Sequence, residues 1–121
     1  GVDEQAAIVL GYDDGAMATL FTSLRVGTPN EVIISGATGR IKLHTPIFRP
    51  QRLTLSLDGK DDEDIDAPYV GDAYSYEAAE VMKCLGEGKL QSEIMPLEET
   101  LEIMRTMDEI RSQWGLKYPG E

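Results

Sequence analysis

Apolar residues in the first half of the chain follow the two-residue period of β-strands. Residues 5–12 and 16–26 are β-rich runs, and the turn Asp13-Asp14-Gly15 between them predicts a hairpin, because Gly accepts the positive φ that such turns need. A second hairpin is predicted over residues 31–44, and the alternating leucines of residues 52–57 predict a fifth strand. Short connections predict antiparallel pairing, since parallel neighbours need long crossovers.

Residues 58–73 separate this half from the next. The run Asp61-Asp62-Glu63-Asp64-Ile65-Asp66 carries five carboxylates and one apolar side chain. Such a segment buries too little apolar surface to offset the entropy lost on ordering. The pattern therefore predicts a solvated, mobile loop.

The period changes to three and four residues after the acidic run. Residues 76–85 predict a short helix with Ser75 as N-cap, Asp72 as the competing cap, and Gly86 as the C′ residue. A second, longer helix is predicted from Pro96, at its first helical position, to a stop at Gly115. Its core-facing stripe is Leu97, Leu101, Met104, Met107, Ile110 and Trp114.

Together these elements predict an α+β fold: an open, mainly antiparallel sheet with helices packed on one face. We expect a single domain over residues 1–121, with a β-sheet half at 3–57, the acidic loop at 58–73 and a helical half at 74–115. Two helices cover only one face of a five-stranded sheet. The other face mixes apolar and polar residues, and we expect it to pair with a second copy, giving a homo-oligomer, most simply a dimer. The alternative is an ordinary exposed face.

Composition narrows the function classes. The 121 residues carry a net charge of −11, which argues against nucleic acid as a partner, because phosphate binding needs clustered Lys and Arg. No apolar run reaches the roughly 20 residues of a membrane span. The single cysteine, Cys84, excludes an internal disulfide and suits a reducing compartment, so we expect a cytoplasmic protein without membrane contact.

Candidate chemistry is sparse. His44 is the only histidine and is expected to be structural or to face solvent, while Cys84 is expected to be an inert small hydrophobe. The alternating Asp62, Asp64 and Asp66 resemble the start of a calcium loop, but the sixth and twelfth positions, which require Gly and Glu, are both alanine. We therefore predict no catalytic, cofactor-binding or metal residues in the chain.

One loop suggests a ligand site. Phe48 and Arg49 lie between Pro46 and Pro50, where an aromatic ring and a guanidinium are suited to stack on and hydrogen-bond to an oxygen-rich ligand. We predict Phe48 and Arg49 as substrate-binding residues. The alternative is a rigid strand connection whose Phe48 covers the edge of the core.

Several stretches resemble the C-terminal domain of the Gfo/Idh/MocA oxidoreductases, in the branch that contains trans-dihydrodiol and D-xylose dehydrogenases. They cover nearly the whole chain: residues 12–18, 32–41, 77–81, 84–89, 92–101, 108–115 and 118–119. The resemblance implies an open antiparallel sheet backed by helices that supplies the substrate pocket and the oligomer interface. It also makes Phe48 the counterpart of an aromatic residue beside the substrate cleft.

The resemblance implies further parts that this sequence does not contain. In the family, an N-terminal Rossmann domain binds NAD or NADP and carries a catalytic Lys in a Glu-Lys-Pro motif, and that domain would be the partner of this one. We therefore expect the substrate-side and oligomerisation domain of an NAD(P)-dependent sugar, polyol or dihydrodiol dehydrogenase, with no bound cofactor and no activity of its own. The alternative is a stand-alone α+β dimerisation or ligand-binding module.

Overall fold

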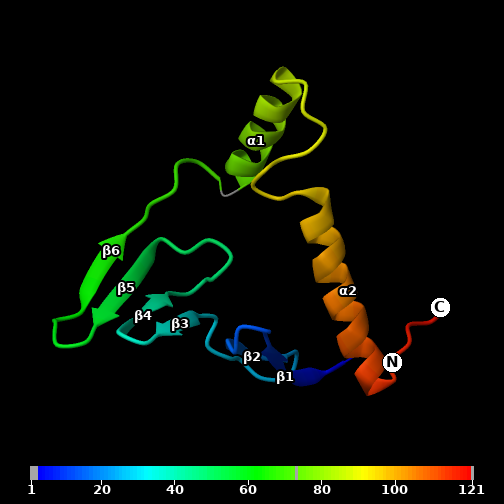
Figure 1. Ribbon diagram of the computed structural model, residues 1–121, viewed down its shortest axis with the longest axis horizontal. Helices are drawn as coiled ribbons and strands as arrows, with labels where there is room; N and C mark the ends of the chain where they lie inside the picture. Colours follow the sequence, from blue (N-terminus) through cyan, green and yellow to red (C-terminus); the bar gives the residue numbers. More distant parts are fainter. Residues whose placement is uncertain (1–2, 73, 121) are drawn as a thin grey trace. The chain divides into compact units, whose positions relative to one another are not determined.

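The computed structural model describes residues 3–72 and 74–120, which belong to two compact units (Figure 1). The first unit combines Gly1–Thr28 with Leu90–Glu121, and the second is Pro29–Lys89. The first contains β1 (Gln5–Gly11), β2 (Met17–Ser23) and α2 (Leu97–Trp114); the second contains β3 (Val32–Gly36), β4 (Gly39–Leu43), β5 (Arg52–Leu57), β6 (Glu63–Asp66) and α1 (Tyr74–Gly86). The predicted α+β class with open antiparallel sheets is confirmed, and the single domain over 1–121 stays a prediction.

The first unit begins with the predicted hairpin. β1 and β2 pair antiparallel, with Ala7 opposite Phe21 and Ile8 opposite Leu20. Gly15 has φ +88°, and the Asp14 carboxylate accepts a hydrogen bond from the Ala16 N–H at 3.0 Å. The turn residues therefore act as the sequence predicts.

Helix α2 begins and ends at residues that the sequence identified. Pro96 occupies the N-cap, with φ −62° and ψ 153°, one position earlier than predicted. At the other end, Gly115 is left-handed with φ 64°, its N–H reaches Ser112 O, and the Leu116 N–H reaches Arg111 O. This pair of bonds satisfies carbonyls that the helix end leaves open.

The second unit holds a four-stranded antiparallel sheet in the order β3-β4-β5-β6. Strand alternation gives it one polar face and one apolar face. The mainly polar face carries Lys42, His44, Arg52, Thr54 and Asp64 together with Ile33; the mainly apolar face carries Ile34, Ile41, Leu43, Leu53, Leu55 and Ile65 together with Glu63. The five predicted strands are thus present, but they form two separate sheets, because β2 and β3 are not hydrogen-bonded to each other.

The prediction of a mobile loop over 58–73 is wrong for part of that segment. Glu63–Asp66 forms β6 and pairs with β5, with Asp64 opposite Thr54 and Ile65 opposite Leu53. A cross-strand apolar pair and a polar partner stabilise this strand despite its low β-propensity. The acidic composition therefore marks an edge strand, where charge discourages further pairing.

The ends of α1 also differ from the prediction. Asp72, the competing cap, accepts a hydrogen bond from the Tyr74 N–H at 3.2 Å, while Ser75 lies inside the helix. The C′ residue is Gly88 and not Gly86: Gly88 has φ +67°, its N–H reaches Leu85 O, and the Lys89 N–H reaches Cys84 O. Gly86 is the last residue of α1 and has no positive φ, so the left-handed residue that ends the helix lies two positions later, at Gly88.

Few side chains are fully buried. Among the described residues, the buried hydrophobic side chains are Ala6 and Cys84. The accessible surface is 10057 Å², whereas two separate compact domains of half this mass would together expose about 7,800 Å². The chain thus exposes about 2,300 Å² more surface than two compact domains of this size would expose. No described helix combines the length and apolar character needed to cross a lipid bilayer.

Candidate functional site

The loop between β4 and β5 is closed and held in place by hydrogen bonds. At its base, the His44 N–H donates to Arg52 O at 3.3 Å, and inside it the Arg49 N–H donates to Pro46 O at 3.1 Å. The Asn30 side-chain oxygen accepts a hydrogen bond from the Ile47 N–H at 2.8 Å. The Thr45–Pro46 peptide bond is cis. These contacts give residues 45–51 a defined conformation.

The predicted site residues Phe48 and Arg49 lie together in this loop. The Phe48 side chain is 72% exposed, and the Arg49 guanidinium carbon lies 5.6 Å from the centre of its ring, within the range of a cation–π contact. An exposed aromatic face beside hydrogen-bond donors is suited to a ligand with both C–H and hydroxyl groups. The alternative in which Phe48 covers the core edge does not fit this exposure. Substrate binding by the two residues stays a prediction.

A polar network lies at the base of the same loop. His44 Nε2 lies 2.8 Å from the Thr54 hydroxyl, which donates to Asp64 Oδ1 at 2.6 Å, and Arg52 lies 3.7 Å from Asp64 Oδ2. The Thr54 hydrogen bond is the main cause of a lowered pKa for the Asp64 carboxyl; partial desolvation raises that pKa, and Arg52 and His44 lower it further. Asp64 is therefore ionised at neutral pH.

Sequence reasoning missed this network. The sequence predicts a solvated loop around Asp64 and a structural or solvent-facing role for His44, and it links neither residue to Thr54. The available signal was the polar alternation of Arg52 and Thr54 in a predicted strand, which implies polar cross-strand neighbours. Only the pairing of β5 with β6 identifies those neighbours.

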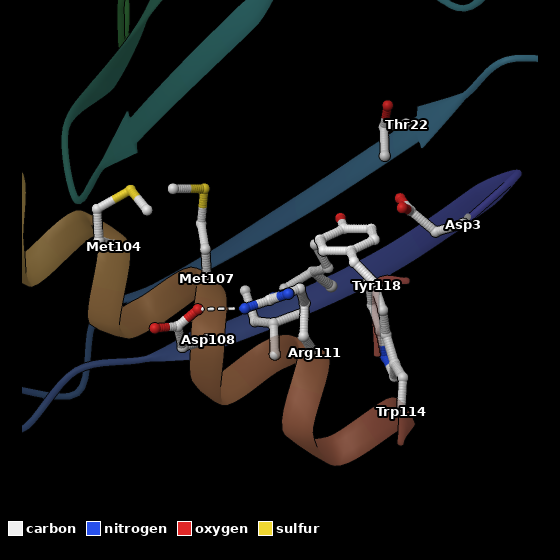
Figure 2. A pocket seen from close by; sticks show the side chains of 10 residues that line it. Asp3, Thr22, Met104, Met107, Asp108, Arg111, Trp114 and Tyr118 are labelled. Atoms are coloured by element: carbon white, nitrogen blue, oxygen red, sulfur yellow. Dashed lines mark hydrogen bonds and ion pairs between the residues drawn. The ribbon is translucent and has the colours of Figure 1, made fainter. Parts of the chain in front are cut away.

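The first unit contains a cavity of about 460 Å³ between the β1–β2 hairpin and α2 (Figure 2). Its wall is mainly apolar, and its polar groups come from both sides. The lining residues are Asp3, Ile8, Thr22, Met104, Met107, Asp108, Ile110, Arg111, Trp114 and Tyr118. The volume lies within the range of small-molecule sites.

The electrostatics of this cavity do not fit a dinucleotide. Its cation, Arg111, forms an ion pair with Asp108 at 2.7 Å, drawn as the dashed line in Figure 2, and its guanidinium carbon lies 4.8 Å from the Tyr118 ring centre. Asp3 adds a second carboxylate to the lining. Two carboxylates and one engaged cation disfavour a pyrophosphate, which is bound by backbone N–H groups and cations.

The residues that the structure describes do not support a metal site either. Among them, no group of three His, Cys, Asp or Glu side chains lies close enough to hold a metal ion. Cys84 is buried, and burial is the main cause of a raised pKa for its thiol, followed by the Glu80 carboxylate 3.5 Å away. A raised pKa keeps the thiol protonated and makes it a poor nucleophile.

Comparison with known proteins gives the class of protein. The chain is 31% identical to D-xylose 1-dehydrogenase (NADP(+)) of Hypocrea jecorina over 98% of this chain and 34% of that protein. It is 33% identical to trans-1,2-dihydrobenzene-1,2-diol dehydrogenase of Xenopus laevis, over 98% of this chain and 38% of that protein. It is 34% identical to scyllo-inositol 2-dehydrogenase (NADP(+)) of Bacillus subtilis, over 100% of this chain and 36% of that protein. No family model matches the chain.

These relatives are dehydrogenases of the Gfo/Idh/MocA type, and this chain belongs to that family. The predicted family resemblance is confirmed. The chain spans about a third of the length of the curated relatives that it matches. In each of these relatives, nearly two thirds of the polypeptide has no counterpart here.

Proposed function

We propose that this chain forms the substrate-side and oligomerisation region of an NADP-dependent dehydrogenase that oxidises a sugar, a polyol or a dihydrodiol. The observation that carries the proposal is the match of almost the entire chain to only a third of three dehydrogenases. Their names specify D-xylose, a cyclic diol and scyllo-inositol, which all carry neighbouring hydroxyl groups. The names of two specify NADP(+).

The loop with Phe48 and Arg49 supports a substrate-side role. An exposed aromatic face and a guanidinium offer what a polyhydroxylated ligand requires, namely a surface for its C–H groups and donors for its oxygens. The acidic cavity in the first unit supports the view that the cofactor binds to another part of the parent protein. Hydride transfer needs the cofactor held against the substrate, so we expect the isolated chain to be inactive.

The decisive experiment compares the isolated chain with the full-length protein that contains it. Each is mixed with NADP and with D-xylose, scyllo-inositol or a dihydrodiol, and formation of NADPH is followed by its absorbance. We expect turnover by the full-length protein and none by the chain alone. Turnover by the isolated chain, or no turnover by the full-length protein with any polyhydroxylated substrate, would overturn the proposal.

Oligomerisation is the second part of the proposal, and the occupant that we propose for the open face of the β1–β2 hairpin is a second copy. Ile8 faces the cavity beside α2, so alternation places Val9, Met17 and Phe21 on the opposite face of the hairpin. These three side chains are 64%, 71% and 55% exposed. A stable interface buries about 800 Å² per partner, so we expect these exposed apolar side chains to form the centre of a contact of that size.

Light scattering on the full-length protein tests this interface. We expect a dimer or larger assembly for the unmodified protein and dissociation in Phe21→Glu, because the substitution places a charge at the centre of the apolar face. Thr28→Glu adds the same charge at an exposed position outside the hairpin and should leave the assembly intact. A monomeric unmodified protein, or equal behaviour of the two variants, would contradict the proposed interface.

The location of the protein in the cell completes the proposal. Cys84 is buried and is the chain's single cysteine, which suits the reducing conditions of the cytoplasm. We place the protein there, and fractionation of cells with an antibody against the chain tests it. Recovery with the membrane or secreted fraction would contradict this location.

A further inference from the structure

The hydrogen bonds that join His44, Thr54 and Asp64 run in one direction. The Thr54 hydroxyl has a single hydrogen, which it donates to the Asp64 carboxylate at 2.6 Å, because an ionised carboxylate only accepts. The same hydroxyl oxygen lies 2.8 Å from His44 Nε2 and must therefore accept there. Nε2 consequently carries a hydrogen. In the neutral imidazole, Nδ1 is then the nitrogen with a free electron pair.

The charged neighbours of His44 are engaged with each other. On β4, Lys42 precedes His44 by two residues on the same face and forms an ion pair with Glu31 at 2.8 Å. On β5, Arg52 faces Asp64 of β6 at 3.7 Å. Among the described residues, none donates a hydrogen bond to His44 Nδ1. The electron pair of His44 Nδ1 is therefore available to accept a hydrogen bond from a group that is not among the described residues.

The position of His44 relates this acceptor to the candidate ligand loop. His44 directly precedes residues 45–51, and its backbone N–H closes that loop on Arg52 O. We propose that Asp64 and Thr54 hold His44 as the Nε2–H tautomer, and that His44 Nδ1 accepts a hydrogen bond from a substrate hydroxyl group bound at the loop that carries Phe48. This inference rests on the proposed function. It assigns Thr54 and Asp64 as positioning residues and His44 as a substrate-binding residue.

The tautomer is tested by nitrogen NMR of the full-length protein labelled with ¹⁵N-histidine at neutral pH. The signals that disappear in His44→Gln identify this imidazole. We expect them to show Nε2 protonated, and we expect a mixture of tautomers in Thr54→Val, which keeps the side-chain shape but removes the hydroxyl. The matched control Thr28→Val, at an exposed position outside the hairpin, should leave the signals unchanged. A mixed or Nδ1–H tautomer in the unmodified protein would contradict the proposed hydrogen-bond directions from His44 through Thr54 to Asp64.

Steady-state kinetics test the substrate contact. His44→Gln keeps a donor near the Nε2 position and removes the Nδ1 acceptor, so we expect KM for the sugar or polyol to rise about 5-fold with kcat little changed. Thr28→Val should leave both constants unchanged. If the Nε2–H tautomer is found and the KM of His44→Gln is unaltered, the hydroxyl contact is wrong while the dehydrogenase assignment stands. If the full-length protein oxidises no polyhydroxylated substrate, the proposed function fails, and this substrate role fails with it.

Discussion

Gly39 offers the sharpest test of the sheet in the second unit, because the structure leaves no room for a side chain there. A Cβ at this position would collide with the backbone oxygen of Ser56 and would lie 2.9 Å from Leu57 Cδ2 and 3.1 Å from Leu57 Cα. Ordinary carbon contacts begin near 3.5 Å. The Leu57 side chain is able to rotate away, but the Ser56 oxygen belongs to the paired strand β5 and moves only with that strand.

We therefore expect Gly39→Ala to weaken the pairing of β4 with β5. Overpacking of this kind costs about 1–3 kcal/mol, and a backbone obstacle favours the upper half of that range. A loss of about 2–3 kcal/mol corresponds to an equilibrium constant for opening of the strand pair that is about 30- to 150-fold larger, since each 1.4 kcal/mol is a factor of ten. Hydrogen exchange of the amides in residues 39–57, measured on the full-length protein, reports this opening directly.

Gly11→Ala provides the matched control. Gly11 is also a strand residue, at the end of β1, but nothing lies within 4 Å of the position that its Cβ would take. The substitution there should be neutral or stabilise the protein by about 0.5 kcal/mol, because alanine restricts the unfolded chain. Equal exchange rates in residues 39–57 for the two variants would refute the steric reasoning.

Three further predictions concern the ligand loop, the edge strand and a helix end. Phe48→Ala should raise KM for the polyhydroxylated substrate several-fold and leave the melting temperature of the full-length protein unchanged, because the ring is mostly exposed; an unaltered KM would remove Phe48 from the site. The pKa of Asp64 lies below its ordinary 3.8, so its ionised form stabilises β6 above that pH and this contribution is lost as pH falls through the lowered pKa. As pH falls, the unmodified protein should therefore lose protection of the amides in residues 63–67 against hydrogen exchange, and Asp64→Asn should abolish this loss. A loss of protection with falling pH that persists in Asp64→Asn would contradict the role of Asp64. Gly88→Ala should destabilise the end of α1 by about 1 kcal/mol, because φ is +67° there; unchanged exchange in residues 84–89 would contradict the left-handed stop.

Local features of the fold were predictable from the sequence alone. The turn at Gly15, the stop of α2 at Gly115 and the strand at Arg52–Leu57 each depend on residues close together in the chain, and these predictions are confirmed. The family was predictable for a similar reason, since short motifs spread over the chain carry the resemblance that the relatives confirm. Phe48 and Arg49 are predicted as substrate-binding residues because an aromatic and a cation between two prolines form a visible local pattern, and that role stays a prediction.

The tertiary structure decided what depends on pairing between distant residues. Composition alone marks residues 63–66 as solvated, but the apolar contact of Ile65 with its partner strand and the Thr54 hydrogen bond to Asp64 make this segment a strand. The same pairing links Asp64 through the Thr54 hydroxyl to His44, which lies ten residues before Thr54 in the chain. No local sequence pattern predicts this link. Local backbone conformation depends mainly on neighbouring residues and is therefore predictable from the sequence. Cross-strand partners depend on the register of the sheet, and that register is fixed only in the folded chain.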